Sequence, residues 1–122
     1  RPYDLRLLEA LPEAEFNVLH VCGSNNMLST LSDYPVAALN WDTQDGTNVW
    51  LDEGERSADI PVIGGISHKD ALVNGSPADV EREVARVRRD MSDSRWMLGP
   101  GCTYSHEAPE ANIRSLSPAY TS

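Results

Sequence analysis

The 122-residue sequence has few cysteines, no long apolar run and few basic residues, and each shortage excludes a class of protein. Two cysteines are too few for a disulfide-rich secreted scaffold. No apolar run approaches the roughly 20 residues that a membrane-spanning helix needs, and the first residues lack a signal-peptide pattern. The sequence has only 10 lysines and arginines against 19 acidic residues. The resulting formal charge of −9 disfavours nucleic acid and anionic membranes as partners. We therefore expect a cytoplasmic protein without a nucleic-acid or membrane partner.

What the sequence does contain is an alternation of short apolar runs with amphipathic stretches. Short, continuously apolar strands that are each followed by a helix are typical of a parallel sheet covered by helices. The sequence thus predicts one α/β domain over residues 1–122, with four β-α units after a first helix. These units fit either a small open sheet or half of an eight-stranded β/α barrel. The expected strands are 16–22, 36–41, 60–63 and 96–98, and the expected helices are 3–11, 26–34, 47–57, 77–91 and 109–116.

The clearest helix signal lies in the second half of the chain. Ser76 is suited to the N-cap, Pro77 to the first helical position and Asp79 to the third. Acidic residues come first and arginines last, in the order that the helix dipole favours. We expect the arginines to form a solvated face of this helix.

One histidine and both cysteines lie where predicted strands end. His20 and Cys22 are two residues apart, so their side chains point to the same face of a strand, and Cys102 follows the last strand. The carboxyl ends of parallel strands share one edge of the sheet, where active sites gather. Thiolate and imidazole are preferred zinc ligands, so these three residues are a candidate zinc site. Buried unreactive thiols, or a disulfide between the two cysteines, are the alternatives.

Three further titratable residues lie near the same edge. Asp42 follows the second strand and is a candidate catalytic residue, either as a fourth ligand, as a general base or as a partner that orients His20. It can equally cap the turn that follows. We expect His68 and His106 to be ordinary exposed loop histidines.

Glycines also mark this edge. Gly64 and Gly65 end the third predicted strand, and Gly101 follows the fourth. A residue without a side chain lets a substrate approach the backbone, so these three glycines are candidates for substrate binding. Tight turns between strand and helix are the alternative reading of the same residues.

Several segments, taken in order, resemble one known family. The segments are RPYDLRLLEAL, VLHVCG, ALNWD, PVIGGI, NGSPADVEREV, LGPGC and HEAPEANIRSL. Together they look like the C-terminal part of the uroporphyrinogen decarboxylase superfamily, and the resemblance covers essentially all 122 residues. It implies the last four β-α units of a TIM (β/α)8 barrel, with the N-terminal half absent. Such a half-barrel is expected to associate with itself or with a complementary N-terminal half.

Within that superfamily, the sequence is most similar to the zinc- and cobalamin-dependent methyltransferases. His20, Cys22 and Cys102 match the H-x-C…C zinc motif of that branch. The resemblance implies a bound Zn²⁺ that holds a small-molecule acceptor thiol as thiolate for methyl transfer. It also implies a corrinoid, carried by a partner protein, as methyl donor.

The decarboxylase branch, which serves porphyrin and haem biosynthesis, is the alternative activity. This lyase uses no metal and carries a Gly-His-Gly type motif on its last strand, where this sequence has Gly101-Cys102-Thr103. That departure counts against a porphyrinogen substrate. A third possibility is a non-catalytic half-barrel that assembles with another chain, and we expect the isolated 122-residue chain to be inactive.

Overall fold

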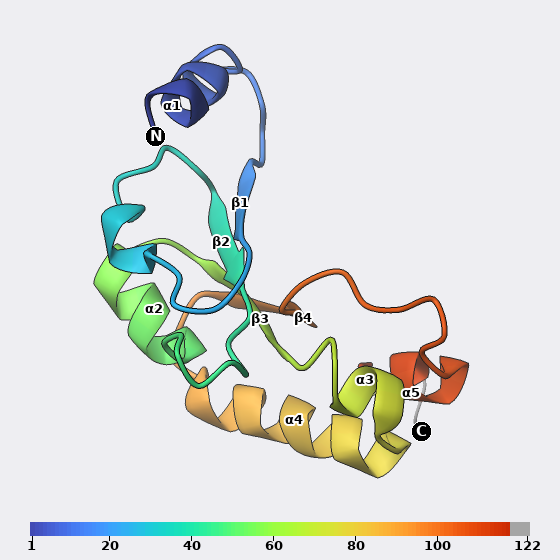
Figure 1. Ribbon diagram of the computed structural model, residues 1–122. Coiled ribbons are helices and arrows are strands. Elements are labelled where there is room, and N and C mark those ends of the chain that lie inside the picture. The colour runs from blue at the N-terminus through green and yellow to red at the C-terminus, as the bar shows by residue number, and fades with distance from the viewer. Residues whose placement is uncertain (118–122) are drawn as a thin grey trace.

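The computed structural model describes residues 1–117, so residues 118–122 of the predicted domain lie outside the described part. Within it, strands and helices alternate and all strands are parallel, in the sheet order β1-β2-β3-β4 (Figure 1). This confirms the predicted α/β fold and is the arrangement of consecutive strands in part of a β/α barrel. The elements are α1 (Pro2–Glu9), β1 (Val18–Val21), a 3-10 turn η1 (Leu28–Thr30), β2 (Ala38–Trp41), α2 (Leu51–Ala58), β3 (Val62–Ile66), α3 (Ala71–Asn74), α4 (Pro77–Asp90), β4 (Trp96–Pro100) and α5 (Glu110–Arg114).

The core lies between the sheet and the helices that cover one of its faces. Figure 1 shows α2 and α4 along the same side of the strands. Trp41 of β2, Leu51 of α2 and Val87 of α4 are completely buried in this layer. Leu39 and Trp41, two residues apart on β2, lie in this layer with the apolar stripe of α4, so Asn40 between them lies on the opposite face, called here the inner face of the sheet.

Helix α4 forms as the sequence predicts. Ser76 and Asp79 form a reciprocal capping box, with Ser76 N–H donating to the Asp79 carboxylate at 2.7 Å. Pro77 occupies the first turn, where a missing N–H costs nothing. Val80 and Val84 face the core, so the arginines on the other face stay in solvent.

Two predicted helices begin later or are shorter than expected. The 26–34 segment forms only the 3-10 turn η1, because its hydroxyl side chains bond locally to the backbone: Thr30 donates to the Met27 carbonyl at 2.7 Å. Helix α2 begins at Leu51 instead of residue 47, because the Asp45 carboxylate accepts the Thr47 N–H at 2.8 Å and holds a turn there.

The third strand is longer than expected. Gly64 and Gly65 do not end it but lie inside β3, which continues to Ile66. Both glycines let helices approach the strand closely, since a Cβ on Gly65 would lie 2.3 Å from a Val87 methyl carbon. A short helix, α3, then precedes α4 and is held by Asn112 of α5, whose buried amide donates to the Gly75 carbonyl at 2.8 Å.

The first helix and the inner face of the sheet leave apolar side chains in solvent. No residue of α1 is buried, and Tyr3 and Leu7 are 77% and 68% exposed. Figure 1 shows α1 standing beyond the N-terminal end of β1. Val18 is 45% exposed on β1 although it belongs to a strand. None of the helices among residues 1–117 has the length and apolar character required to cross a bilayer.

Candidate functional site

The structure brings His20, Cys22 and Cys102 together at the carboxyl edge of the sheet. His20 lies on β1, Cys22 directly follows this strand, and Cys102 follows β4 at the other side of the sheet. One potential ligand atom from each residue lies within 4.8 Å of the other two. Both cysteines are free thiols, so the predicted alternative of a disulfide is not formed here.

The dimensions of this cluster fit a tetrahedral zinc ion. The Cys22 and Cys102 sulfurs lie 4.0 Å apart. Two thiolates that each lie about 2.3 Å from a tetrahedral zinc are separated by about 3.8 Å, so the sulfurs need to move little. Two sulfurs and one imidazole also leave the fourth tetrahedral position for another ligand, which is the donor arrangement of catalytic zinc sites.

A residue that the sequence analysis left without a role completes the cluster. Asn40 of β2 pairs in register with His20 of β1, and its Oδ1 lies 2.6 Å from His20 Nδ1. An amide in the otherwise apolar segment VAALNW is the sequence signal that could have marked it. Asp42, which was one candidate for orienting His20, does not occupy this position.

The loop that follows Cys22 is tied to the loop that follows β2. The Ser24 hydroxyl bonds to the Asp45 carboxylate, and Asn25 N–H donates to the Thr47 hydroxyl at 2.7 Å. Hydrogen bonds from Ser24 and Thr47 lower the pKa of Asp45 to about 2. The ionised Asp45 therefore anchors the backbone beside Cys22 throughout the neutral pH range.

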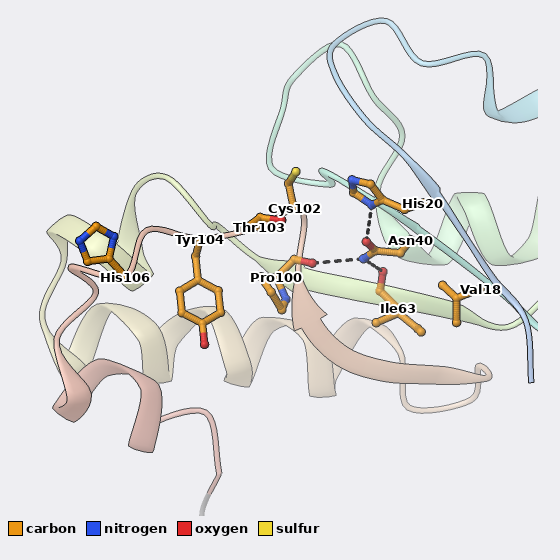
Figure 2. A pocket seen from close by; sticks show the side chains of 9 residues that line it. All are labelled: Val18, His20, Asn40, Ile63, Pro100, Cys102, Thr103, Tyr104 and His106. Carbon is orange, nitrogen blue, oxygen red and sulfur yellow. Dashed lines mark hydrogen bonds between the residues drawn. The ribbon is translucent and has the colours of Figure 1, made fainter.

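A bowl of about 720 Å³ opens beside the cluster on the inner face of the sheet. Figure 2 shows its side chains, with the sulfur of Cys102 and the ring of His20 at the upper rim. The surface of the bowl is mostly apolar and carries a few polar groups, which is typical of small-molecule sites. The lining residues are Val18, Ile63 and Pro100, then His20, Asn40 and Cys102, and finally Thr103, Tyr104 and His106.

Asp42 lies at the same edge of the sheet but does not belong to the cluster of three potential ligands. Its side chain is buried, and Oδ1 accepts the Gln44 N–H at 3.1 Å, as expected for a residue that caps a turn. Its other oxygen lies 3.9 Å from Nδ1 of His68. His68 is itself buried, contrary to our expectation of an exposed loop residue, because it packs under this turn.

A second carboxylate lies behind this pair. Glu83 of α4 accepts the Ser67 N–H at 2.7 Å and thereby holds the end of β3 against the helix. Burial raises the pKa of Glu83, and the neighbouring carboxylates of Asp70 and Asp42 act in the same direction.

The three glycines predicted to bind substrate each lie in a tight packing contact. A Cβ on Gly64 would lie 3.2 Å from Leu51, on the helix side of the sheet, and neither Gly64 nor Gly65 lines the bowl. A Cβ on Gly101 would lie 2.7 Å from the Cα of Asp42. Their contact with a substrate remains a prediction.

Comparison with known proteins places this arrangement in a family. The sequence matches the family described as "Uroporphyrinogen decarboxylase (URO-D)" over residues 1–121. A solved structure, a methyltransferase from Methanosarcina mazei, is similar with a TM-score of 0.77 and 22% sequence identity. The match covers 96% of this chain and 33% of that chain, so this chain spans about a third of that protein's length, and the likeness shows a shared fold. No curated protein matches the sequence. Because the family match extends over nearly the whole sequence, the chain belongs to the uroporphyrinogen decarboxylase (URO-D) family.

Proposed function

We propose that this chain carries the zinc site of a methyltransferase that transfers a methyl group from a corrinoid donor to a small-molecule thiol. The observation that supports the proposal is the meeting of His20, Cys22 and Cys102 within 4.8 Å at the edge of the bowl. His20 and the two cysteines would hold the ion. A bound zinc supplies Lewis acidity, which lowers the pKa of a coordinated thiol and makes it a nucleophile near neutral pH.

The remaining residues of the bowl bind and shield the acceptor. Val18, Ile63 and Pro100 give it an apolar floor beside the cluster, so the carbon skeleton of a thiol can pack there while its sulfur faces His20 and Cys102. The sulfur attacks the methyl carbon, and the bond between that carbon and its carrier breaks. Asp42 is the proposed catalytic carboxylate, since it lies at the same edge and is in contact with Gly101, which directly precedes Cys102.

Uroporphyrinogen decarboxylation is the second candidate, and the description of the matching family favours it. Cys102 stands where that reaction's branch is expected to carry a Gly-His-Gly type motif. The decarboxylase branch uses no metal, so it does not require two thiols and an imidazole placed to bind one ion. The cluster therefore favours the methyltransferase.

We also propose that further β-α units cover the inner face of the sheet, either from a complementary half-barrel or from a second copy of the chain. The outer strands β1 and β4 each have one unpaired edge within the described part of the chain. Unpaired edges and exposed apolar side chains favour association with another chain.

The test of the zinc site is metal analysis of the protein purified without chelator. We expect about one zinc per chain, and loss of most of it in Cys22→Ser and in Cys102→Ser, because a thiolate ligand is removed in each. Asp52→Ser, which removes a partly exposed carboxylate on α2, controls for adventitious binding by this acidic chain and should leave the zinc content unchanged.

Absence of zinc from the folded protein, or equal zinc in all three variants, would contradict the proposed site. Formation of coproporphyrinogen from uroporphyrinogen without added metal would instead support the decarboxylase. For the chain assembled with a complementary half-barrel, the methyltransferase proposal expects methylation of a thiol by a methylated corrinoid, and loss of this activity in both cysteine variants.

A further inference from the structure

The side chain of Asn40 connects all four strands of the sheet. It projects from β2, and its Oδ1 lies 2.6 Å from Nδ1 of His20 on β1. Its Nδ2 lies 2.8 Å from the carbonyl oxygen of Ile63 on β3 and 3.1 Å from that of Pro100 on β4. Figure 2 shows these three hydrogen bonds meeting at one amide.

These contacts determine how the amide is oriented. The carbonyl oxygens of Ile63 and Pro100 can only accept hydrogen bonds, so the Asn40 atom that faces both of them must be the NH₂ group. The opposite end of the amide is then its oxygen, which also can only accept. His20 Nδ1 must therefore carry the hydrogen atom that this short contact requires.

This hydrogen placement decides which ring nitrogen of His20 is free. A neutral imidazole carries a hydrogen on only one of its two nitrogens, so with Nδ1 protonated the free lone pair lies on Nε2. In Figure 2 the ring nitrogen that is not bonded to Asn40 faces the side on which the sulfur of Cys102 lies. The free lone pair thus lies on the side of the ring that faces Cys102, the second thiol of the cluster.

We propose that Asn40 is a positioning residue that holds His20 in the Nδ1–H tautomer and presents Nε2 as the metal-binding atom. The inference rests on the proposed zinc site only where zinc affinity is measured, because the tautomer of His20 is a property of the metal-free protein. A partner that fixes the tautomer of a histidine ligand also raises its basicity and fixes its ring orientation.

An asparagine performs this role differently from an aspartate. Both side chains accept a hydrogen bond from Nδ1–H, but only the amide also donates to the carbonyls of Ile63 and Pro100. Through Pro100 the amide holds the end of β4, which leads directly to Cys102. Asn40 therefore fixes the orientation of the His20 ring, and it also holds β1 and the end of β4, which leads to Cys102, at a set distance from each other.

The first readout is the tautomer of His20 in metal-free protein, measured from its ring ¹⁵N chemical shifts at a pH where the ring is neutral. Among the signals of the three histidines, that of His20 is identified by its loss in His20→Ala. We expect the Nδ1–H tautomer in the wild type and in Asn40→Asp, and a shift toward Nε2–H in Asn40→Leu, which has no acceptor.

The second readout is zinc affinity by competition with a chromophoric chelator. We expect a 10- to 100-fold weaker affinity in Asn40→Leu, in the range typical of lost outer-shell partners, and a smaller loss in Asn40→Asp. Asn112→Leu is the matched control, because it removes another amide that donates to backbone carbonyls, outside the cluster. It should lower stability without changing the tautomer or the zinc affinity.

The possible failures are distinguishable. An unchanged His20 tautomer in Asn40→Leu that still folds by circular dichroism overturns the inference, and so does an affinity loss in Asn112→Leu equal to that in Asn40→Leu. If the wild-type protein binds no zinc, the proposed function fails, whereas the tautomer measurement still decides whether Asn40 positions His20.

Discussion

Replacing Gly65 by alanine tests the closest approach between the sheet and its covering helices. Gly65 has a φ of +101°, a conformation that L-residues rarely adopt, and imposing it on alanine costs about 1–3 kcal/mol. The new Cβ would also lie 2.3 Å from a methyl carbon of Val87 and 3.2 Å from Leu51. Overpacking of this kind costs about 1–3 kcal/mol. The two effects together predict that Gly65→Ala lowers the free energy of unfolding by about 2–6 kcal/mol, a large part of the stability of a domain.

Urea unfolding followed by tryptophan fluorescence measures this loss. Gly46→Ala is the matched control, because a Cβ there meets no atom within 4 Å and the backbone is not left-handed, so its effect should stay within about 1 kcal/mol. Adding Val87→Ala to Gly65→Ala should recover part of the packing cost but none of the backbone cost. The double-mutant cycle therefore isolates the contact between these two residues.

A Gly65→Ala protein as stable as the wild type, with no coupling to Val87, would refute the packing argument. The substrate-binding role predicted for Gly65 would then be the better explanation for a glycine at this position.

Two further predictions concern the pH dependence of stability and the assembly state. Burial raises the pKa of Glu83, so the folded state binds the carboxyl proton more tightly than the unfolded state does. Protonation of Glu83 therefore adds to the free energy of unfolding at low pH. This contribution is lost as pH rises from 4.5, the ordinary pKa, through the raised pKa of the folded state. The Tm of Glu83→Gln relative to wild type should therefore increase with pH over this interval, and a constant or falling difference would contradict it. Light scattering of the purified 122-residue chain should give a mass above the 13.4 kDa monomer, because the inner face and strand edges are uncovered; a stable, well-folded monomer would oppose the proposed association.

The sequence alone determined the four strands, most of the helices and their order. Apolar runs followed by amphipathic stretches predicted the four parallel β-α units, and the residues Ser76, Pro77 and Asp79 predicted the start of α4, because local capping chemistry needs no distant partner. The two-residue spacing of His20 and Cys22 also predicted that their side chains share a face, since side chains alternate along a strand. Only contacts within a few residues are needed for these predictions.

Tertiary structure decided what depends on pairing between distant segments. The sequence predicts that Gly64 and Gly65 end the third strand, yet both lie inside β3, because α2 and α4 pack where their side chains would be. His68 is buried for a similar reason, since the turn at Asp42 covers it. Asn40 acquired its place beside His20 only through the register of β1 on β2, and the 4.0 Å between the two sulfurs arises only when all four strands are assembled. Register and packing set these distances, and neither can be read from residue types or spacing along the chain.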